Sequence, residues 1–267
     1  MRSIPFVAAS LVLASVVAVR AQADLAPTDK LRAAYLASNP AQATRNPQTG
    51  EVRGPSLDLA EALAKKVGKP FDFKPIPNPP AVIEAVKNGE ADIGFVAYEA
   101  TRLGTVEFSQ TYMLVQQSFL VLGDSPIKAV ADVDRAGRKI AGTRADSITL
   151  CMKRVLKQAT LVELENNPDL IVKALTGKEI DALGANRQRL TTLMRSIPGS
   201  RLLPDNFFNV PQNIVVPKDR PQALAAVDAF IDEMRGSGFL RDAIARGGAT
   251  GVEVAPKSPG SQHGCPG

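Results

Sequence analysis

The sequence of 267 residues contains one histidine, His263, which lies in a C-terminal segment rich in glycine, proline and serine. A Ser-His-Asp triad needs a histidine as its general base, and many catalytic zinc sites use histidine as a ligand. One histidine in such a segment therefore argues against both kinds of site. We expect no catalytic residue, no bound metal and no cofactor.

Cysteine is also scarce. Cys151 and Cys265 are the two cysteines of the chain, which are too few for a disulfide framework. A bond between them is compatible with an oxidising compartment. Nothing in the sequence requires that bond, so the state of the two cysteines stays open.

Blocks of basic residues are absent as well. The formal net charge is +5, and the basic residues are spread along the chain. Proteins that bind nucleic acid usually carry a basic stripe or an arginine-rich helix, so we do not expect nucleic acid as a partner. Beyond residue 23 no stretch is long and apolar enough to cross a bilayer, which predicts a soluble mature protein.

The first 23 residues have the pattern of a signal peptide. Arg2 is followed by an apolar stretch over residues 4–19 and by Ala-Gln-Ala at residues 21–23, a cleavage motif of small residues. We predict removal of residues 1–23 and export to the periplasm, and a retained membrane anchor is the alternative. Cleavage removes two arginines and no acid, which leaves 244 residues with a net charge of +3.

Strands and helices alternate in the first part of the mature chain. Short apolar runs predict strands, and apolar residues at helical spacing predict helices. The predicted strands cover residues 31–36, 71–76 and 93–97, and the helices between them cover residues 57–67, capped by Ser56, and 81–88. This alternation favours a mainly parallel sheet with helices on both faces.

A second unit of the same kind follows. Strands predicted over residues 138–141, 161–164 and 180–184 alternate with helices over residues 148–159, 168–176 and 188–196. The chain leaves the first unit near Phe119, returns near Gln212, and then forms helices over residues 221–235 and 238–246. The two crossings predict a first lobe of residues 24–118 plus 212–252 and a second lobe of residues 119–211, followed by a disordered tail of residues 253–267.

Arg102 follows Thr101 just past the predicted strand of residues 93–97. Open α/β sheets bind ligands beyond the carboxyl ends of their strands. A planar guanidinium at that edge can hold a carboxylate through two parallel hydrogen bonds. From this stretch alone, a solvated loop arginine is the competing interpretation.

Four segments, in the same order along the chain, carry a family resemblance. They are residues 50–68 (GEVRGPSLDLAEALAKKVG), 82–95 (VIEAVKNGEADIGF), 100–112 (with ATR and VEFSQTY) and 177–183 (GKEIDAL). The chain resembles the bacterial extracellular solute-binding proteins of family 3, the periplasmic receptors of ATP-driven (ABC) importers, typically for polar amino acids. The resemblance implies an α/β, type II periplasmic-binding-protein fold with two lobes, each a mainly parallel sheet flanked by helices, and two hinge crossovers.

The same resemblance indicates ligand-binding residues. Arg102 matches the arginine that anchors the ligand's carboxylate. Asp146, Ser147 and Ile148 match a loop and helix start that reach the ligand, where unpaired N–H groups favour an anion. Alternatively, Asp146 or Ser147 only caps the helix. The remaining candidates for ligand contact are Tyr98, Thr101, Asn39, Asn186, Arg187 and Gln212.

Two departures from the family's pattern bear on the ligand. Residues 38–42 lack the aromatic side chain that stacks on the ligand, and Asn186 stands where the family has an acid for the ammonium group. An ammonium without a counter-charge in a closing cleft is costly. With Arg102, Arg144 and Arg187 near the cleft, a ligand richer in carboxylates is the alternative: a polycarboxylate, an aromatic acid or an anionic cofactor.

The resemblance predicts a periplasmic, monomeric binding protein and not an enzyme. It would capture a small organic anion or amino acid between its lobes and deliver it to the membrane permease of an ABC importer. Two alternatives stay open. Some proteins of this fold are dehydratases of prephenate-like acids, for which Glu99 is the one acid near Arg102. A sensor or accessory module of the same fold is the other alternative.

Overall fold

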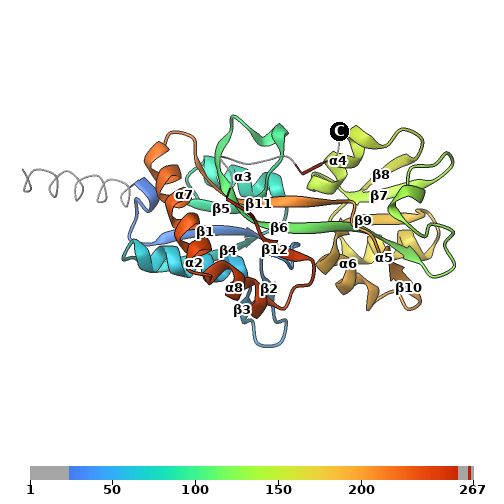
Figure 1. Cartoon of the computed structure of the whole chain (residues 1–267), viewed down its shortest axis with the longest axis horizontal. Coiled ribbons are helices and arrows are strands. Elements are labelled where there is room, and N and C mark those ends of the chain that lie inside the picture. Colours follow the sequence, from blue (N-terminus) through green and yellow to red (C-terminus); the bar gives the residue numbers. More distant parts are fainter. Residues whose placement is uncertain (1–23, 258–263, 266–267) are drawn as a thin grey trace, which may run out of the picture.

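The computed structural model describes residues 24–257 and 264–265, which form a long molecule with two halves (Figure 1). The predicted signal peptide, residues 1–23, lies outside the described residues. Within those residues, no helix is both long enough and apolar enough to cross a membrane.

One sheet of ten strands runs through both halves. Eight strands follow one another in the order β4-β1-β5-β11-β6-β9-β7-β8, and β10 and β12 pair with β6 beside this path. The strands are β1 (Leu31–Leu36), β4 (Phe71–Ile76), β5 (Ile93–Ala97), β6 (Val106–Leu122), β7 (Lys139–Thr143), β8 (Thr160–Leu164), β9 (Ala182–Asn186), β10 (Ser200–Leu202), β11 (Phe208–Pro217) and β12 (Val252–Val254). A separate hairpin consists of β2 (Thr44–Arg45) and β3 (Val52–Arg53).

The two ends of the sheet are parallel, and its middle is antiparallel. β4, β1 and β5 pair in parallel at one end, and β8, β7 and β9 do so at the other. The long strands β6 and β11 run antiparallel to each other and connect the two ends. The predicted α/β architecture with a mainly parallel sheet is confirmed. We call the half built on β1, β4 and β5 the first lobe, and the half built on β7, β8 and β9 the second lobe.

Helices cover the sheet in both lobes (Figure 1). The first lobe carries α2 (Pro55–Lys66), α3 (Pro79–Lys87), α7 (Pro221–Gly236) and α8 (Phe239–Gly247), and the second lobe carries α4 (Ser147–Val155), α5 (Pro168–Thr176) and α6 (Arg187–Met194). Two short 3₁₀ turns, η1 (Ala100–Arg102) and η2 (Val130–Asp132), lie in the connections.

Each lobe has apolar cores of its own. In the first lobe, Leu59 of α2 and Val82 of α3 belong to two separate clusters of buried side chains. In the second lobe, Met152 of α4 and Leu190 of α6 belong to two further clusters. The lobe boundaries predicted at residues 118/119 and 211/212 fall inside β6 and β11, and they stay a prediction.

The start of α2 differs from the predicted one. The residue before the helix is Gly54, with a φ of 147°, and Pro55 occupies the first turn. A Cβ on Gly54 would lie 2.5 Å from the carbonyl oxygen of Gln42, so the close approach requires glycine. Proline suits the first helical position because its missing N–H has no partner there. Ser56 therefore does not cap the helix, and its buried hydroxyl lies 3.0 Å from the Tyr112 hydroxyl.

The prediction of a disordered tail over residues 253–267 is wrong for its start, while residues 258–263 and 266–267 lie outside the described residues. Residues 252–254 form β12 and pair with residues 113–115 of β6. Ala255 is buried, and its carbonyl accepts a hydrogen bond from Nε of Arg235 at 2.9 Å. Cys265 is joined to Cys151 of α4 by a disulfide bond. Backbone pairing on a neighbouring strand does not depend on apolar side chains, so the composition of the tail gave no sign of it.

Candidate functional site

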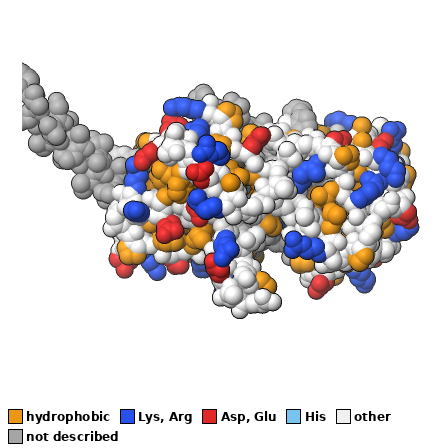
Figure 2. Space-filling model, turned by 60° about the horizontal axis from the view of Figure 1, so that its bottom comes forward, with side chains coloured by type: hydrophobic (Ala, Val, Ile, Leu, Met, Phe, Trp, Pro, Cys, Tyr) orange, Lys and Arg blue, Asp and Glu red, His pale blue; other side chains and the backbone are white. Residues whose placement is uncertain are grey.

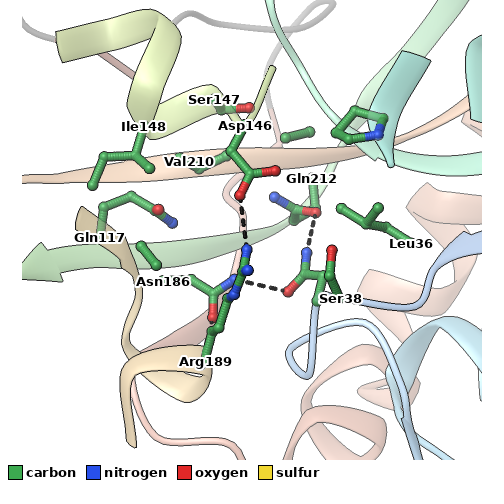
Figure 3. A pocket seen from close by; sticks show the side chains of 14 residues that line it. Leu36, Ser38, Gln117, Asp146, Ser147, Ile148, Asn186, Arg189, Val210 and Gln212 are labelled. Atoms are coloured by element: carbon green, nitrogen blue, oxygen red, sulfur yellow. Dashed lines mark hydrogen bonds and ion pairs between the residues drawn. The ribbon is translucent and has the colours of Figure 1, made fainter. Parts of the chain in front are cut away.

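A pocket lies where β5 of the first lobe and the connecting strand β11 face α4 and α6 of the second lobe. Its walls come from both lobes (Figure 3). The lining residues are Leu36, Ser38, Asn39, Pro79, Ala97, Gln117, Asp146, Ser147, Ile148, Ala185, Asn186, Arg189, Val210 and Gln212. The cavity volume is about 40 Å³, which leaves room for roughly three water molecules. This space is smaller than an amino acid.

A chain of side-chain amides crosses the pocket from one lobe to the other. The Gln212 Oε1 atom accepts hydrogen bonds from Nε2 of Gln42 at 3.0 Å and from Nδ2 of Asn39 at 3.3 Å. The Asn39 Oδ1 atom in turn accepts a hydrogen bond from Nδ2 of Asn186 at 3.1 Å. Asn39 belongs to the first lobe and Asn186 ends β9 in the second lobe. The bond between Asn39 and Asn186 therefore exists only while the lobes are together.

Asp146 and Arg189 form an ion pair on the second-lobe wall of the pocket. Their Oδ2 and Nη1 atoms are 3.0 Å apart, and the side chains are 18% and 10% exposed. The Nη2 atom of Arg189 also donates to Oδ1 of Asn166 at 2.7 Å. Burial raises the pKa of Asp146, while the charges of Arg189 and Arg102 oppose that rise. The wall thus holds a carboxylate and a guanidinium at the ligand space.

The start of α4 presents unpaired backbone donors to the same space. The first backbone bond of the helix runs from the N–H of Leu150 to the carbonyl of Asp146, so the N–H groups before it have no partner within the helix. Asp146 is the residue before the helix, but its side chain makes no capping hydrogen bond. Its carboxylate points to Arg189 instead (Figure 3). The interpretation of Asp146 as a simple cap therefore does not describe this structure.

Arg102, the predicted carboxylate anchor, lies behind the pocket wall and not among its lining residues. Its Nη1 atom donates to the carbonyl of Ala97 in the first lobe at 2.7 Å, and its Nη2 atom donates to the carbonyl of Ala145 in the second lobe at 2.8 Å. Burial lowers the pKa of Arg102 to about 10, so the group stays charged at neutral pH. Its positive charge interacts with the carboxylates of Glu99 and Asp146.

Six of the ten residues predicted to contact the ligand line the pocket: Asn39, Asp146, Ser147, Ile148, Asn186 and Gln212. The other four, Arg102, Tyr98, Thr101 and Arg187, do not. Tyr98 packs edge-on against the ring of Phe108, and Thr101 is exposed in η1. The predicted amide residues and the start of α4 therefore line the pocket, and the predicted arginines, Arg102 and Arg187, do not.

Arg189 is the charged residue, among the described lining residues, that the sequence interpretation missed. Arg187 was proposed in its place, but the Nη2 atom of Arg187 turns to the carbonyls of Leu203, Pro204 and Asp205. Arg189 lies three residues after Asn186, whose side chain accepts a hydrogen bond from the N–H of Arg189 at 2.8 Å. Residues three apart share one face of a helix, and that spacing was the available signal.

Glu99, the acid considered for dehydratase chemistry, also lies outside the pocket lining. Its Oε1 atom accepts a hydrogen bond from Nη1 of Arg154 at 2.8 Å. Within the part of the chain that the structure describes, no group of three or more His, Cys, Asp or Glu residues is placed to hold a metal ion.

A pocket walled by two lobes, which two long strands connect, is the architecture of a two-lobed binding protein. Residues 31–246 match the family model of the bacterial extracellular solute-binding proteins, family 3. The chain belongs to this family. The resemblance predicted from its sequence motifs is confirmed.

Curated relatives and solved structures agree with this assignment. The chain is 29% identical over 175 residues to the glutamine-binding protein of Geobacillus stearothermophilus. This alignment covers 64% of this chain and 66% of that protein. It is 25% identical over 199 residues to the ABC transporter glutamine-binding protein GlnH of Bacillus subtilis. That alignment covers 73% of this chain and 72% of GlnH. The chain thus spans about two thirds of the first relative's length.

A solved structure shows the fold. An amino acid ABC transporter substrate-binding protein from Streptococcus pneumoniae, bound to L-arginine, superposes with a TM-score of 0.69 at 22% identity. The match covers 82% of this chain and 94% of that one. The predicted type II periplasmic-binding-protein fold is confirmed.

Proposed function

We propose that this protein is the solute-binding component of an amino-acid ABC importer, and that it captures a small carboxylate-bearing amino acid between its lobes. The observation that carries the proposal is the pocket to which both lobes contribute polar side chains, Asn39 and Gln212 from one side and Asp146 and Asn186 from the other. A ligand that contacts both walls stabilises the closed form, because only that form makes both sets of contacts.

The start of α4 is the proposed receptor for the ligand's carboxylate. Ser147 and Ile148 line the pocket, and their N–H groups stand at the positive end of the helix dipole. Arg102 adds a buried positive charge behind this wall, since one of its hydrogen bonds ends on the carbonyl of Ala145. This gives Arg102 a role in attracting the carboxylate without a direct contact in the closed form.

The amides of the pocket suit a polar, uncharged ligand side chain. Gln212 has a donor, Nε2, and Gln117 has an acceptor, Oε1, that none of the hydrogen bonds described here uses, and Asn39 and Asn186 lie beside them. The names of the two curated relatives, both glutamine-binding proteins, support the same class of ligand. A polycarboxylate has less support, because Arg189 is the one cationic side chain among the described lining residues and Asp146 already pairs with it.

Delivery requires a membrane permease as partner and export of the protein, as the family's extracellular proteins imply. Hinge closure is the known motion of periplasmic binding proteins. Here β6 and β11 are the two connections through which such a hinge passes. On the face shown in Figure 2, acidic and basic side chains are interspersed and form no continuous basic patch, which gives no support to a nucleic-acid partner.

Ligand screening tests the proposal. The twenty L-amino acids, together with glutarate, succinate and phenylpyruvate, are added to the protein, and the melting temperature is recorded. A ligand that binds only the folded protein raises that temperature by mass action. We expect the largest rise with a polar amino acid such as L-glutamine, and small-angle scattering should show a more compact molecule on its addition.

A pair of variants connects binding to the pocket. Gln212→Met keeps the side-chain length but removes the amide that accepts hydrogen bonds from Gln42 and Asn39. It should weaken binding of L-glutamine about tenfold, the typical effect of losing a buried polar contact. Gln158→Met changes an exposed side chain in the same way and serves as the control. Absence of binding by every compound, with the protein folded, would reject the proposal.

A further inference from the structure

The pocket contains one acidic side chain. Of the lining residues that the structure describes, Asp146 is the sole acid and Arg189 the sole base. An amino acid brings an ammonium group as well as a carboxylate, and a desolvated ammonium needs an acceptor of opposite charge. Asn186, which the family resemblance predicts to face the ammonium group, is neutral.

Asn186 is also occupied by contacts within the protein. Its Oδ1 atom accepts the N–H of Arg189 at 2.8 Å, and its Nδ2 atom donates to Oδ1 of Asn39 at 3.1 Å. The side chain therefore caps α6 and bridges the lobes. An ammonium group could bind Asn186 only as a second donor to Oδ1, beside the N–H of Arg189, and the amide would supply no counter-charge.

Asp146 has an oxygen available on the pocket side. Its Oδ2 atom pairs with Nη1 of Arg189 at 3.0 Å. Figure 3 shows the other carboxylate oxygen turned away from Arg189, on the side of the pocket where Gln212 lies. Arg189 is held in place by its second hydrogen bond, to Asn166. The pair thus presents a fixed, partly compensated carboxylate to the ligand space.

Asp146 also has the right neighbours for an α-amino acid. Such a ligand carries its ammonium and its carboxylate on the same carbon, so the receptors of the two groups must be adjacent. The side chain of Asp146 and the N–H groups of Ser147 and Ile148 belong to one turn at the start of α4. That turn can receive both charged groups of the ligand together.

We propose that Asp146 receives the α-ammonium group of the ligand in place of the residue at the end of β9, and that Arg189 acts as a positioning residue for its carboxylate. This inference rests on the proposed function. Asp146 then determines specificity for amino acids over simple acids. An anion without an ammonium group would place a second negative charge beside Asp146 in a desolvated site, which is unfavourable.

A matched pair of ligands tests the role of Asp146. L-Glutamine and glutaramate, which is glutamine without its α-amino group, are titrated into the wild-type protein by calorimetry. The wild-type protein should prefer glutamine by about 100-fold, the range for charge-assisted hydrogen bonds. Asp146→Asn should weaken glutamine binding by a similar factor and bring the two affinities close together. Asp169→Asn, which removes an exposed acid of α5, should keep the wild-type preference.

The pH profile of binding tests the role of Arg189. Arg189→Gln removes the positive charge that lies beside the Asp146 carboxylate. The carboxylate should therefore take up its proton at a higher pH. The pH at which glutamine binding is half lost should therefore move upward relative to the wild-type protein. A purely structural role for Arg189 would lower affinity at all pH values without moving this midpoint, and that result would remove the positioning role.

The outcomes separate this inference from the proposed function. If another amino acid binds more tightly than glutamine, that amino acid and its des-amino acid replace the pair of ligands. If Asp146→Asn keeps the wild-type preference for the amino acid, the inference is wrong while the solute-binding function stands. If dicarboxylates bind and no amino acid does, the inference is again wrong. If nothing binds to the folded protein, the proposed function fails and the inference fails with it.

Discussion

The side chains of Glu99 and Arg154 form an ion pair across the two lobes, with Oε1 and Nη1 2.8 Å apart. Glu99 follows β5 in the first lobe, and Arg154 lies in the last turn of α4 in the second lobe. The Glu99 side chain is 2% exposed and that of Arg154 is 39% exposed. Neither residue lines the pocket. The pair therefore joins the two lobes in this structure from outside the pocket.

Glu99→Gln should consequently shift the protein toward the open form and weaken ligand binding from a distance. Losing a charge-assisted hydrogen bond that exists only when the lobes are closed should raise the Kd about 5- to 20-fold, mainly through faster dissociation. Stopped-flow dissociation and small-angle scattering of the ligand-free protein measure the two effects. Asp124→Asn is the control, because Asp124 pairs with Lys178 on the exposed surface of the second lobe. Equal dissociation rates for Glu99→Gln and the wild-type protein would contradict this role.

Arg102→Lys should also disfavour the closed form. The guanidinium of Arg102 reaches the carbonyls of Ala97 and Ala145 with two different nitrogen atoms. A lysine ammonium keeps the charge but lacks the fork that serves two separated acceptors. We expect ligand affinity to fall at least tenfold, with a smaller loss for Arg144→Lys, since Arg144 forms an exposed ion pair with Glu165. Calorimetric titration of both variants would decide the matter, and equal losses would count against the special position of Arg102.

Ser56 and Tyr112 provide a test of the first-lobe core. Their hydroxyl groups are 3.0 Å apart and fully buried, and burial raises the pKa of Tyr112. Tyr112→Phe leaves the Ser56 hydroxyl without this partner and should lower the free energy of unfolding by about 1–2 kcal/mol. Adding Ser56→Ala removes the orphaned hydroxyl, so the double variant should be less destabilised than the sum of the single changes. Urea unfolding of the four proteins measures the coupling, and simple additivity would show that the contact contributes nothing.

The sequence predicted the elements well where the pattern was local. The strands at residues 31–36, 71–76 and 93–97 have the predicted bounds, because turn-forming Gly, Pro and Asn residues stand near their ends. β6 shows the limit: it is a single strand of 17 residues that passes from one lobe to the other. Its side chains face different neighbours along its length, so no one periodicity describes it.

The candidate site was predicted less completely than the fold. The sequence located Asp146 and Asn186 at the pocket through their places at a loop and a strand end. It did not separate Arg187 from Arg189, which lie two residues apart on α6 and point in different directions. It also could not show that Arg102 donates to backbone carbonyls of both lobes. Such contacts depend on how the lobes meet, which no local pattern contains.

Titration of Asp146 should contribute to the pH dependence of the free energy of unfolding. Burial raises its pKa, against the charges of Arg189 and Arg102. Between the ordinary value near 4 and the raised value, the folded protein therefore binds more protons than the unfolded chain, and stability falls as the pH rises through that window. The side chain introduced by Asp146→Asn does not titrate. The free energy of unfolding of this variant, relative to that of the wild-type protein, should therefore rise between about pH 3 and pH 7. Urea unfolding at several pH values checks this, and a parallel pair of curves would contradict it.

The bond between Cys151 and Cys265 should make the protein sensitive to reductant. It joins α4 of the second lobe to the C-terminal segment, at a sequence separation of 114 residues. Cross-links that close long loops stabilise proteins by about 3–5 kcal/mol through the unfolded chain. Cys265→Ser should lower the free energy of unfolding by a comparable amount, and it avoids a cavity at the fully buried Cys151. Reductant should bring the wild-type melting temperature down to that of the variant and should leave the variant unchanged. Two titratable thiols in the denatured, unreduced wild-type protein would show that the bond does not form.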